Sequence, residues 1–154
     1  MTPAEELRYL VLATEREGNR MLAAALRPLG LTPSQAEVLR VLQDHQPLSL
    51  AELGERLVCE GGSPSRLVTR LIEGGLVEQK PSPTDNRKVA LTLSEAGGNL
   101  AARVTVVEAE LHASISTLLE GAPVSELLGL LWRFVEDRPA GKALAKRTGR
   151  KQPR

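Results

Sequence analysis

The stretch CEGGSPSRLVTRL, residues 59–71, contains the signals that begin a helix after a tight turn. Gly61 and Gly62 allow the chain to turn sharply, and Ser63 and Pro64 are residue types that favour the first positions of a helix. The apolar residues that follow recur on one helical face: Leu67, Val68, Leu71 and Ile72. The opposite face is polar: Ser65, Arg66, Thr69 and Arg70. We therefore expect a helix that packs one face into a core and offers the other to a partner.

A β-hairpin is predicted directly after this helix, because the period of the apolar residues changes from that of a helix to that of a strand. Residues 76–80 and 88–93 read as strands, and residues 81–87 between them are rich in turn formers. The second strand is expected to place one set of residues on a single face: Val89, Leu91 and Leu93. A short helix precedes the glycine turn, marked by Leu50, Leu53 and Leu57. Helix, glycine turn, second helix and hairpin is the order of a winged helix-turn-helix.

The residue types on the polar face are those that bind a DNA duplex. The major groove admits one α-helix, and hydroxyl and guanidinium groups can bond phosphates or the edges of bases. The start of the helix, with Ser63 as its expected cap, adds free N–H groups for a phosphate. At the hairpin tip, Arg87 and Lys88 can reach an adjacent minor groove, with Asp85 orienting Arg87 or bracing the turn. The alternatives are a solvated corner of an all-helical protein and plain turn chemistry at the tip.

Other helices are legible from their starts and their apolar spacing. Three starts carry a hydroxyl at the N-cap and Glu or Gln three residues later, the pattern of a capping box. They lie at Thr2, Thr32 and Ser49. Helical spacing continues from Ser94 to Gly121 and again after Pro123. The expected fold is mainly α, with about six helices and one small hairpin in a single domain over residues 1–137.

Length, charge and cysteine content bound the class of protein. The 154 residues suffice for one core, and the single cysteine excludes an internal disulfide. Neither a leader nor a run of roughly 18 apolar residues is present, so we expect a cytoplasmic protein without membrane contact. Residues 138–154 contain seven of the 20 basic residues and none of the 19 acidic ones, which leaves residues 1–137 with a net charge of −6. We expect a flexible basic tail there; a supplementary phosphate-binding arm is the alternative.

Residues 63–97, SPSRLVTRLIEGGLVEQKPSPTDNRKVALTLSEAG, resemble the signature of the MarR family of transcriptional regulators. The resemblance lies in the polar helix, its Gly-Leu-Val exit, the Asp-x-Arg hairpin and the Leu-Thr strand, and the helix order extends it over residues 3–137. It implies a homodimer, joined mainly through the first and last helices, that reads a palindromic operator. Carried over by position, the DNA-contacting residues are Ser63, Ser65, Arg66, Thr69 and Arg70 in the helix and Arg87 and Lys88 in the hairpin. In one departure, Gln79 and Lys80 stand where relatives often have Arg.

The apolar faces of the first and last helices favour a dimer independently of the resemblance. These faces lie at the two ends of the chain, and one small lobe can hardly cover both, so a two-fold interface is the economical arrangement. We expect residues 1–30 and 98–137 to serve mainly in dimerisation and residues 31–97 to form the DNA-binding lobe. A symmetric dimer predicts a symmetric DNA site with half-sites one helical turn apart, and an affinity that falls steeply with salt.

The predicted function is that of a homodimeric, sequence-specific DNA-binding regulator, a repressor relieved by a small ligand or an oxidant. The resembled family commonly responds to small aromatic or phenolic ligands. Cys59, beside the glycine turn, is a candidate oxidant sensor, although most free cysteines are buried and inert. A winged-helix protein-interaction module without DNA binding is the alternative. No enzyme activity, cofactor or metal is expected, because no nucleophile–base pair or phosphate loop is present and His45 and His112 lack ligand-spaced partners.

Overall fold

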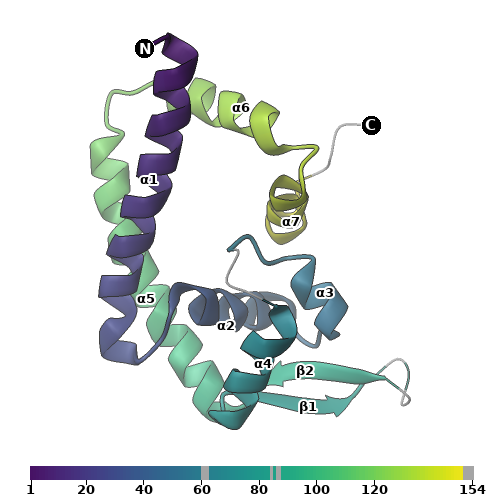
Figure 1. The fold of residues 1–154 in the computed structure, drawn as a ribbon. Coiled ribbons are helices and arrows are strands. Elements are labelled where there is room, and N and C mark those ends of the chain that lie inside the picture. Colours follow the sequence, from purple (N-terminus) through teal and green to yellow (C-terminus); the bar gives the residue numbers. More distant parts are fainter. Residues whose placement is uncertain (60–62, 84, 86–87, 151–154) are drawn as a thin grey trace.

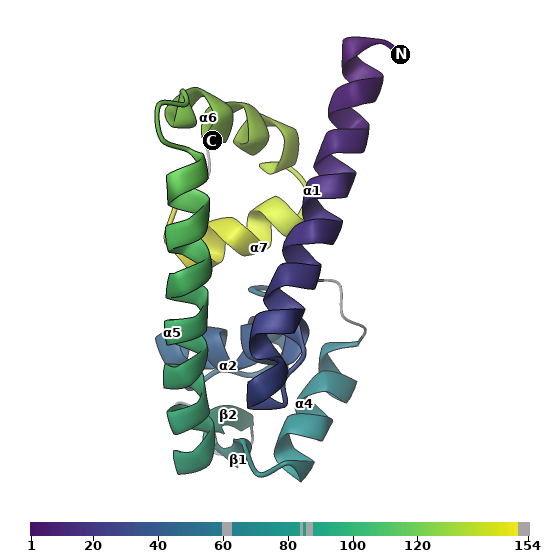
Figure 2. The ribbon, with the colours of Figure 1, turned by 90° about the vertical axis from the view of Figure 1, so that its left-hand side faces the viewer.

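The computed structural model describes residues 1–59, 63–83, 85 and 88–150. Two long helices, α1 (Pro3–Leu26) and α5 (Glu95–Leu118), run side by side, and a lobe of smaller elements lies at one end of them (Figures 1 and 2). The lobe comprises α2 (Pro33–His45), α3 (Leu50–Gly54), α4 (Pro64–Glu73), β1 (Val77–Pro81) and β2 (Val89–Leu93). The remaining elements are a 3-10 helix η1 (Arg27–Leu29), α6 (Val124–Val135) and α7 (Pro139–Thr148). The predicted winged helix-turn-helix is confirmed, with seven α-helices in the described ranges.

Three helices begin with the capping boxes that the sequence predicts. At the starts of α1, α2 and α3, the N-cap hydroxyl accepts a backbone N–H three residues on, and the Glu or Gln there accepts the N-cap N–H. At α3, the Glu52 carboxylate accepts the Ser49 backbone N–H at 2.8 Å and the Ser49 hydroxyl at 2.7 Å. These hydrogen bonds lower the pKa of Glu52. The hydrogen bonds between Ser49 and Glu52 therefore fix where α3, the first helix of the helix-turn-helix, begins.

One hydrophobic core joins the lobe to the long helices. Its largest fully buried side chains come from α1, α2, α3, α4, β1 and α5: Leu26, Val38, Leu39, Val41, Leu42, Leu53, Leu71, Val77 and Val104. The central element is α2, which contacts α1, α3, α4, α5 and β2. Packing on α2, α3 and β1 therefore sets the orientation of α4. Such packing is also the usual source of stability for a helix of this length.

The strands form an antiparallel hairpin that projects from the lobe (Figure 1). Leu91 also exchanges two backbone hydrogen bonds with Leu48, so β2 is paired on both edges at this point. Burial in β2 does not follow its two faces, because Val89 is 53% exposed whereas Ala90 and Leu91 are both buried. The reason is position along the hairpin, since Val89 pairs with Pro81 at the end that lies beyond the core.

Residues 139–148 form helix α7, where we expected a flexible basic tail. Pro139 stands at the first helical position and Gly149 ends the helix with φ 68°, the left-handed conformation that glycine adopts readily. The residues between are mainly good helix formers, and Gly141, Ala143 and Ala145 are buried. The charge pattern suggested a solvated segment, but helical packing beside α6 outweighs it. Residues 151–154 lie outside the described residues.

Many apolar side chains on α1, α5 and α6 remain exposed in the single chain. They include Leu7, Leu10, Leu12, Met21, Val106, Ile115, Leu118, Leu127, Leu130, Leu131 and Phe134. Helices α1 and α5 extend away from the lobe, and α6 lies at their far end (Figures 1 and 2). Within the described ranges, no helix combines the length and apolar character needed to cross a membrane.

Candidate nucleic-acid interface

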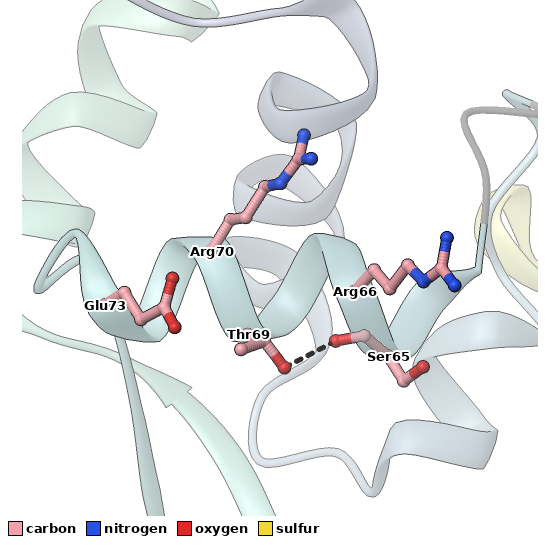
Figure 3. Close-up of a pocket in the computed structure, with 5 residues that line it drawn as sticks. All are labelled: Ser65, Arg66, Thr69, Arg70 and Glu73. Carbon is pink, nitrogen blue, oxygen red and sulfur yellow. Dashed lines mark hydrogen bonds between the residues drawn. The ribbon is translucent and has the colours of Figure 1, made fainter.

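Helix α4 has two faces of opposite character, as the sequence predicts. Val68 and Leu71 are buried in the core, and Leu67 and Ile72 pack against it. The opposite face is exposed, and Figure 3 shows the open depression that its side chains line: Ser65, Arg66, Thr69, Arg70 and Glu73. The structure therefore brings four of the predicted contact residues together on one accessible surface: Ser65, Arg66, Thr69 and Arg70. We call this surface, with Glu73, the α4 polar face.

The side chains of the α4 polar face form two rows along the helix (Figure 3). Arg66 and Arg70 are four residues apart and make one row; Ser65, Thr69 and Glu73 make the other. Neither guanidinium has an ion-pair or hydrogen-bond partner among the described residues. Thr69 donates its hydroxyl hydrogen to the Ser65 carbonyl at 2.9 Å, which leaves its oxygen free to accept. Both arginines are thus available to an anionic or base ligand.

Ser63 occupies the N-cap position of α4, but its side chain does not cap the helix as expected. Its hydroxyl lies 2.6 Å from the Ser65 hydroxyl, and only its carbonyl accepts from the helix, through the N–H groups of Arg66 and Leu67. The hydroxyl is drawn to Ser65 because the two side chains are neighbours at the exposed first turn. Pro64 has no N–H, and those of Arg66 and Leu67 bond the Ser63 carbonyl, so in this first turn the Ser65 N–H is left for a phosphate.

Glu73 was missed by the sequence reasoning, which considered only hydroxyl and basic side chains on this helix. The signal was available in the spacing, since Glu73 follows Thr69 by four residues and so shares its row. A carboxylate at this place repels phosphate but can accept a hydrogen bond from the amino group of cytosine. It adds a hydrogen-bond acceptor to the α4 polar face.

The hairpin carries the second predicted contact region. Lys88 is exposed and lies at the start of β2, where its N–H donates to the Asp85 carbonyl at 2.9 Å and its carbonyl accepts from Ser82 at 2.8 Å. Arg87 lies outside the described residues. Lys80, which pairs with Ala90 near the tip end of β1, forms an ion pair with Glu78 at 2.9 Å, and this reduces the positive charge that the strand offers. Of the described hairpin cations, Lys88 is thus the one placed nearest the tip.

A buried carboxylate, which the sequence reasoning also missed, holds the chain that leads into α4. Glu37 of α2 accepts the backbone N–H groups of Val58 and Cys59, each at 2.9 Å. These two residues follow α3 and precede Gly61 and Gly62 in the sequence. Glu37 stood within an otherwise apolar stretch of α2, and a lone acidic residue on a buried helical face was the signal that could have singled it out.

Cys59 has an environment that suppresses its reactivity. The residue is at the surface, but partial desolvation and the negative charge of Glu37 beside it raise the pKa of the thiol to about 11. Reactive cysteines have lowered pKa values and positive surroundings, because the thiolate is the nucleophile. Among the described residues, no group of three or more His, Cys, Asp or Glu could hold a metal ion.

The fold and the α4 polar face define a winged helix-turn-helix protein, and the comparisons show which family it resembles. Residues 29–88 match the MarR family. The organic hydroperoxide resistance transcriptional regulator of Bacillus subtilis is 30% identical over 95 residues, which cover 62% of this chain and 65% of that protein. The multiple antibiotic resistance protein MarR of Escherichia coli is 28% identical over 123 residues, covering 79% of this chain and 85% of that protein.

Solved structures agree with this assignment. A mutant MarR from E. coli, complexed with operator DNA, matches with a TM-score of 0.74 and 27% identity, over 84% of this chain and 94% of that one. Staphylococcus aureus MarR, in complex with salicylate and kanamycin, matches in fold with a TM-score of 0.71 and 21% identity, over 86% of this chain and 90% of that one. The family match, the relatives and the operator-DNA structure together support a MarR-family winged helix-turn-helix transcriptional regulator.

Proposed function

We propose that this protein is a homodimeric, sequence-specific DNA-binding regulator whose α4 polar face enters the major groove. The observation that carries the proposal is the pairing of Arg66 and Arg70 on one exposed side of a helix whose other side is anchored in the core. A helix held in this way can present its side chains to base edges without moving. The operator complex of the related E. coli MarR supports the same use of the fold.

Each residue of the interface has a role that fits its chemistry. Arg66 and Arg70 can bond guanine edges or phosphates, and the hydroxyls of Ser63, Ser65 and Thr69 can bond either. Lys88, with Arg87, would reach the flanking minor groove from the hairpin. Positive charge on both elements attracts the duplex although the chain as a whole carries a net charge of only +1.

The exposed apolar side chains of α1, α5 and α6 support a homodimer. Soluble monomers rarely expose apolar patches of this extent, and a second copy of the chain supplies a complementary surface by two-fold symmetry. Two lobes related by such an axis would present two α4 polar faces to one duplex. Residues 1–30 and 98–137 would then serve mainly in dimerisation, and residues 31–97 in DNA binding.

We further propose that the protein acts in the cytoplasm as a repressor and that a small molecule relieves repression. The salicylate complex of the S. aureus relative favours a small aromatic acid as the class to test. An oxidant acting through Cys59 is less favoured, since a thiol with a pKa of about 11 is almost wholly protonated at neutral pH.

Selection from a pool of random duplexes tests the proposal without knowledge of the operator. The protein should enrich a two-fold symmetric sequence with half-sites about 10 base pairs apart, because a symmetric dimer imposes its own symmetry on the site. Enrichment of no sequence, with the protein dimeric and folded, would favour a winged-helix module that binds another protein.

A further inference from the structure

Glu37 is the one buried charged side chain in the described part of the chain, and it is 6% exposed. A buried carboxylate is stable only when hydrogen bonds and an opposite charge replace its water. Two of its partners are the backbone N–H groups of Val58 and Cys59, on the segment that leads to α4. Both oxygen atoms of the carboxylate are used, one by each N–H group.

The opposite charge comes from the far end of the chain. Arg147 of α7 donates from its guanidinium to the Glu37 carboxylate at 2.9 Å, across 110 residues of sequence. The neighbouring Lys146 pairs with Glu55, at the end of α3. Two successive residues of α7 thus bind α2 and the end of α3, and the segment that Glu37 holds follows α3 in the chain. Figure 1 shows α7 beside this part of the lobe.

Helix α7 is also joined tightly to α6. A Cβ atom at Gly141 would lie 2.0 Å from the Val135 carbonyl oxygen, so only glycine permits the close corner between the two helices. The Arg150 guanidinium stacks over the Trp132 ring at 4.4 Å from its centroid. A displacement of α6, whose exposed apolar side chains we assign to the dimer, would therefore be passed to α7 and to Glu37.

We infer that α7 is a strap: a helix that holds the segment leading into α4 and links this segment to α6, which we assign to the dimer. Arg147 and Glu37 are then positioning residues for DNA binding. The inference rests on the proposed function. It assigns the basic residues Lys146 and Arg147 to carboxylates of the lobe rather than to phosphates of the duplex. Arg147 then acts through Glu37, and its charge does not have to touch DNA.

Affinity for the selected duplex, measured over a range of salt concentrations, distinguishes these roles. Arg147→Ala and Glu37→Gln should each weaken binding by about three- to tenfold, while the slope of log affinity against log salt stays that of the wild type. In the Glu37→Gln background, Arg147→Ala should add less than about twofold, because both changes release the same strap. Lys142→Ala removes an exposed charge from the same helix and is the matched control; it should leave the affinity unchanged.

A second variant displaces α7 without changing any charge. Gly141→Ala should reproduce the loss seen with Arg147→Ala, whereas Gly129→Ala on α6, where a Cβ meets nothing within 4 Å, should not. Hydrogen exchange of the DNA-free proteins gives a readout that does not depend on binding. Backbone amides of Val58 and Cys59 should exchange faster in Arg147→Ala than in the wild type and in Lys142→Ala.

The opposite results overturn the inference. If Arg147→Ala lowers the salt slope by about 0.9 and its effect multiplies with that of Glu37→Gln, Arg147 is a phosphate ligand. If Arg147→Ala binds and exchanges as the wild type does, α7 has no positioning role. A wild-type protein that selects no duplex would defeat the proposed function, and the exchange of Val58 and Cys59 would still decide whether the strap holds this segment.

Discussion

The Nε atom of Arg40 on α2 lies 3.0 Å from the Oε2 atom of Glu108 on α5, with each side chain less than one fifth exposed. This ion pair joins the centre of the DNA-binding lobe to a helix that we assign to the dimer. Arg40→Met should lower the free energy of unfolding by about 1–3 kcal/mol, because Glu108 would lose a charged hydrogen-bond partner in a partly buried place. Urea unfolding of the two proteins measures the difference.

The control for this change is Arg20→Ala. Arg20 also forms an ion pair, with Glu17 at 2.8 Å, but both side chains are more than three fifths exposed. Exposed pairs contribute about 0–1 kcal/mol, so this variant should unfold close to the wild type. Equal effects in the two variants would show that the Arg40 pair has no special part in joining lobe and helix.

Gly97, near the start of α5, cannot carry a side chain. A Cβ there would lie 1.9 Å from the Leu76 carbonyl oxygen, at the turn between α4 and β1. Gly97→Ala should therefore cost about 1–3 kcal/mol or more, as overpacking does. At Gly98 a Cβ meets nothing within 4 Å, so Gly98→Ala should be neutral or stabilise the helix by about 1 kcal/mol. Thermal unfolding should show a lower Tm for Gly97→Ala and no decrease in Tm for Gly98→Ala.

The thiol of Cys59 reports on the Glu37 carboxylate. With a pKa of about 11 against the ordinary 9.0, its thiolate fraction at pH 8 is about a hundredfold lower, and alkylation by iodoacetamide should be correspondingly slow. The rate should rise with pH until about pH 11. Glu37→Gln removes a negative charge that raises this pKa and should speed alkylation; Arg147→Ala removes a positive charge that lowers it and should slow alkylation. A rate that levels off near pH 8 would contradict the assignment.

Phe134 on α6 tests the dimer. It is 76% exposed in the single chain, so Phe134→Glu should not disturb the fold of one protomer but should weaken association through the apolar surface. Val89→Glu on the hairpin, 53% exposed, is the matched control. Sedimentation over a range of concentrations should show dissociation of the first variant only. Dissociation of neither would place the interface elsewhere.

The parts of the fold that depend on local chemistry could be predicted from the sequence. Thr32 with Gln35, and Ser49 with Glu52, fix helix starts through side chains three residues apart, and they do so in the structure. The two faces of α4 followed equally from helical periodicity. Such signals involve neighbours in the chain, so no knowledge of the tertiary fold was needed.

Features that depend on distant contacts could not be predicted in this way. Helix α7 looked like a solvated basic tail, because the carboxylates that pair with Lys146 and Arg147 lie about a hundred residues earlier. Glu37 was hidden for the same reason, since its partners come from two other segments. Ser63 was predicted as a side-chain cap, but its hydroxyl bonds Ser65 instead. Whether the DNA-contacting residues act as proposed stays a prediction.

DNA recognition by α4 is tested most directly by measuring affinity for the selected duplex. The proteins to compare are the wild type, Arg66→Ala and Arg70→Ala. Each variant should lose about 1–3 kcal/mol of binding free energy, and a variant that loses a phosphate contact should also lower the salt slope by about 1. Arg20→Ala, on α1, should bind as the wild type does. If both α4 variants bind with wild-type affinity and slope, the α4 polar face is not the surface that meets DNA.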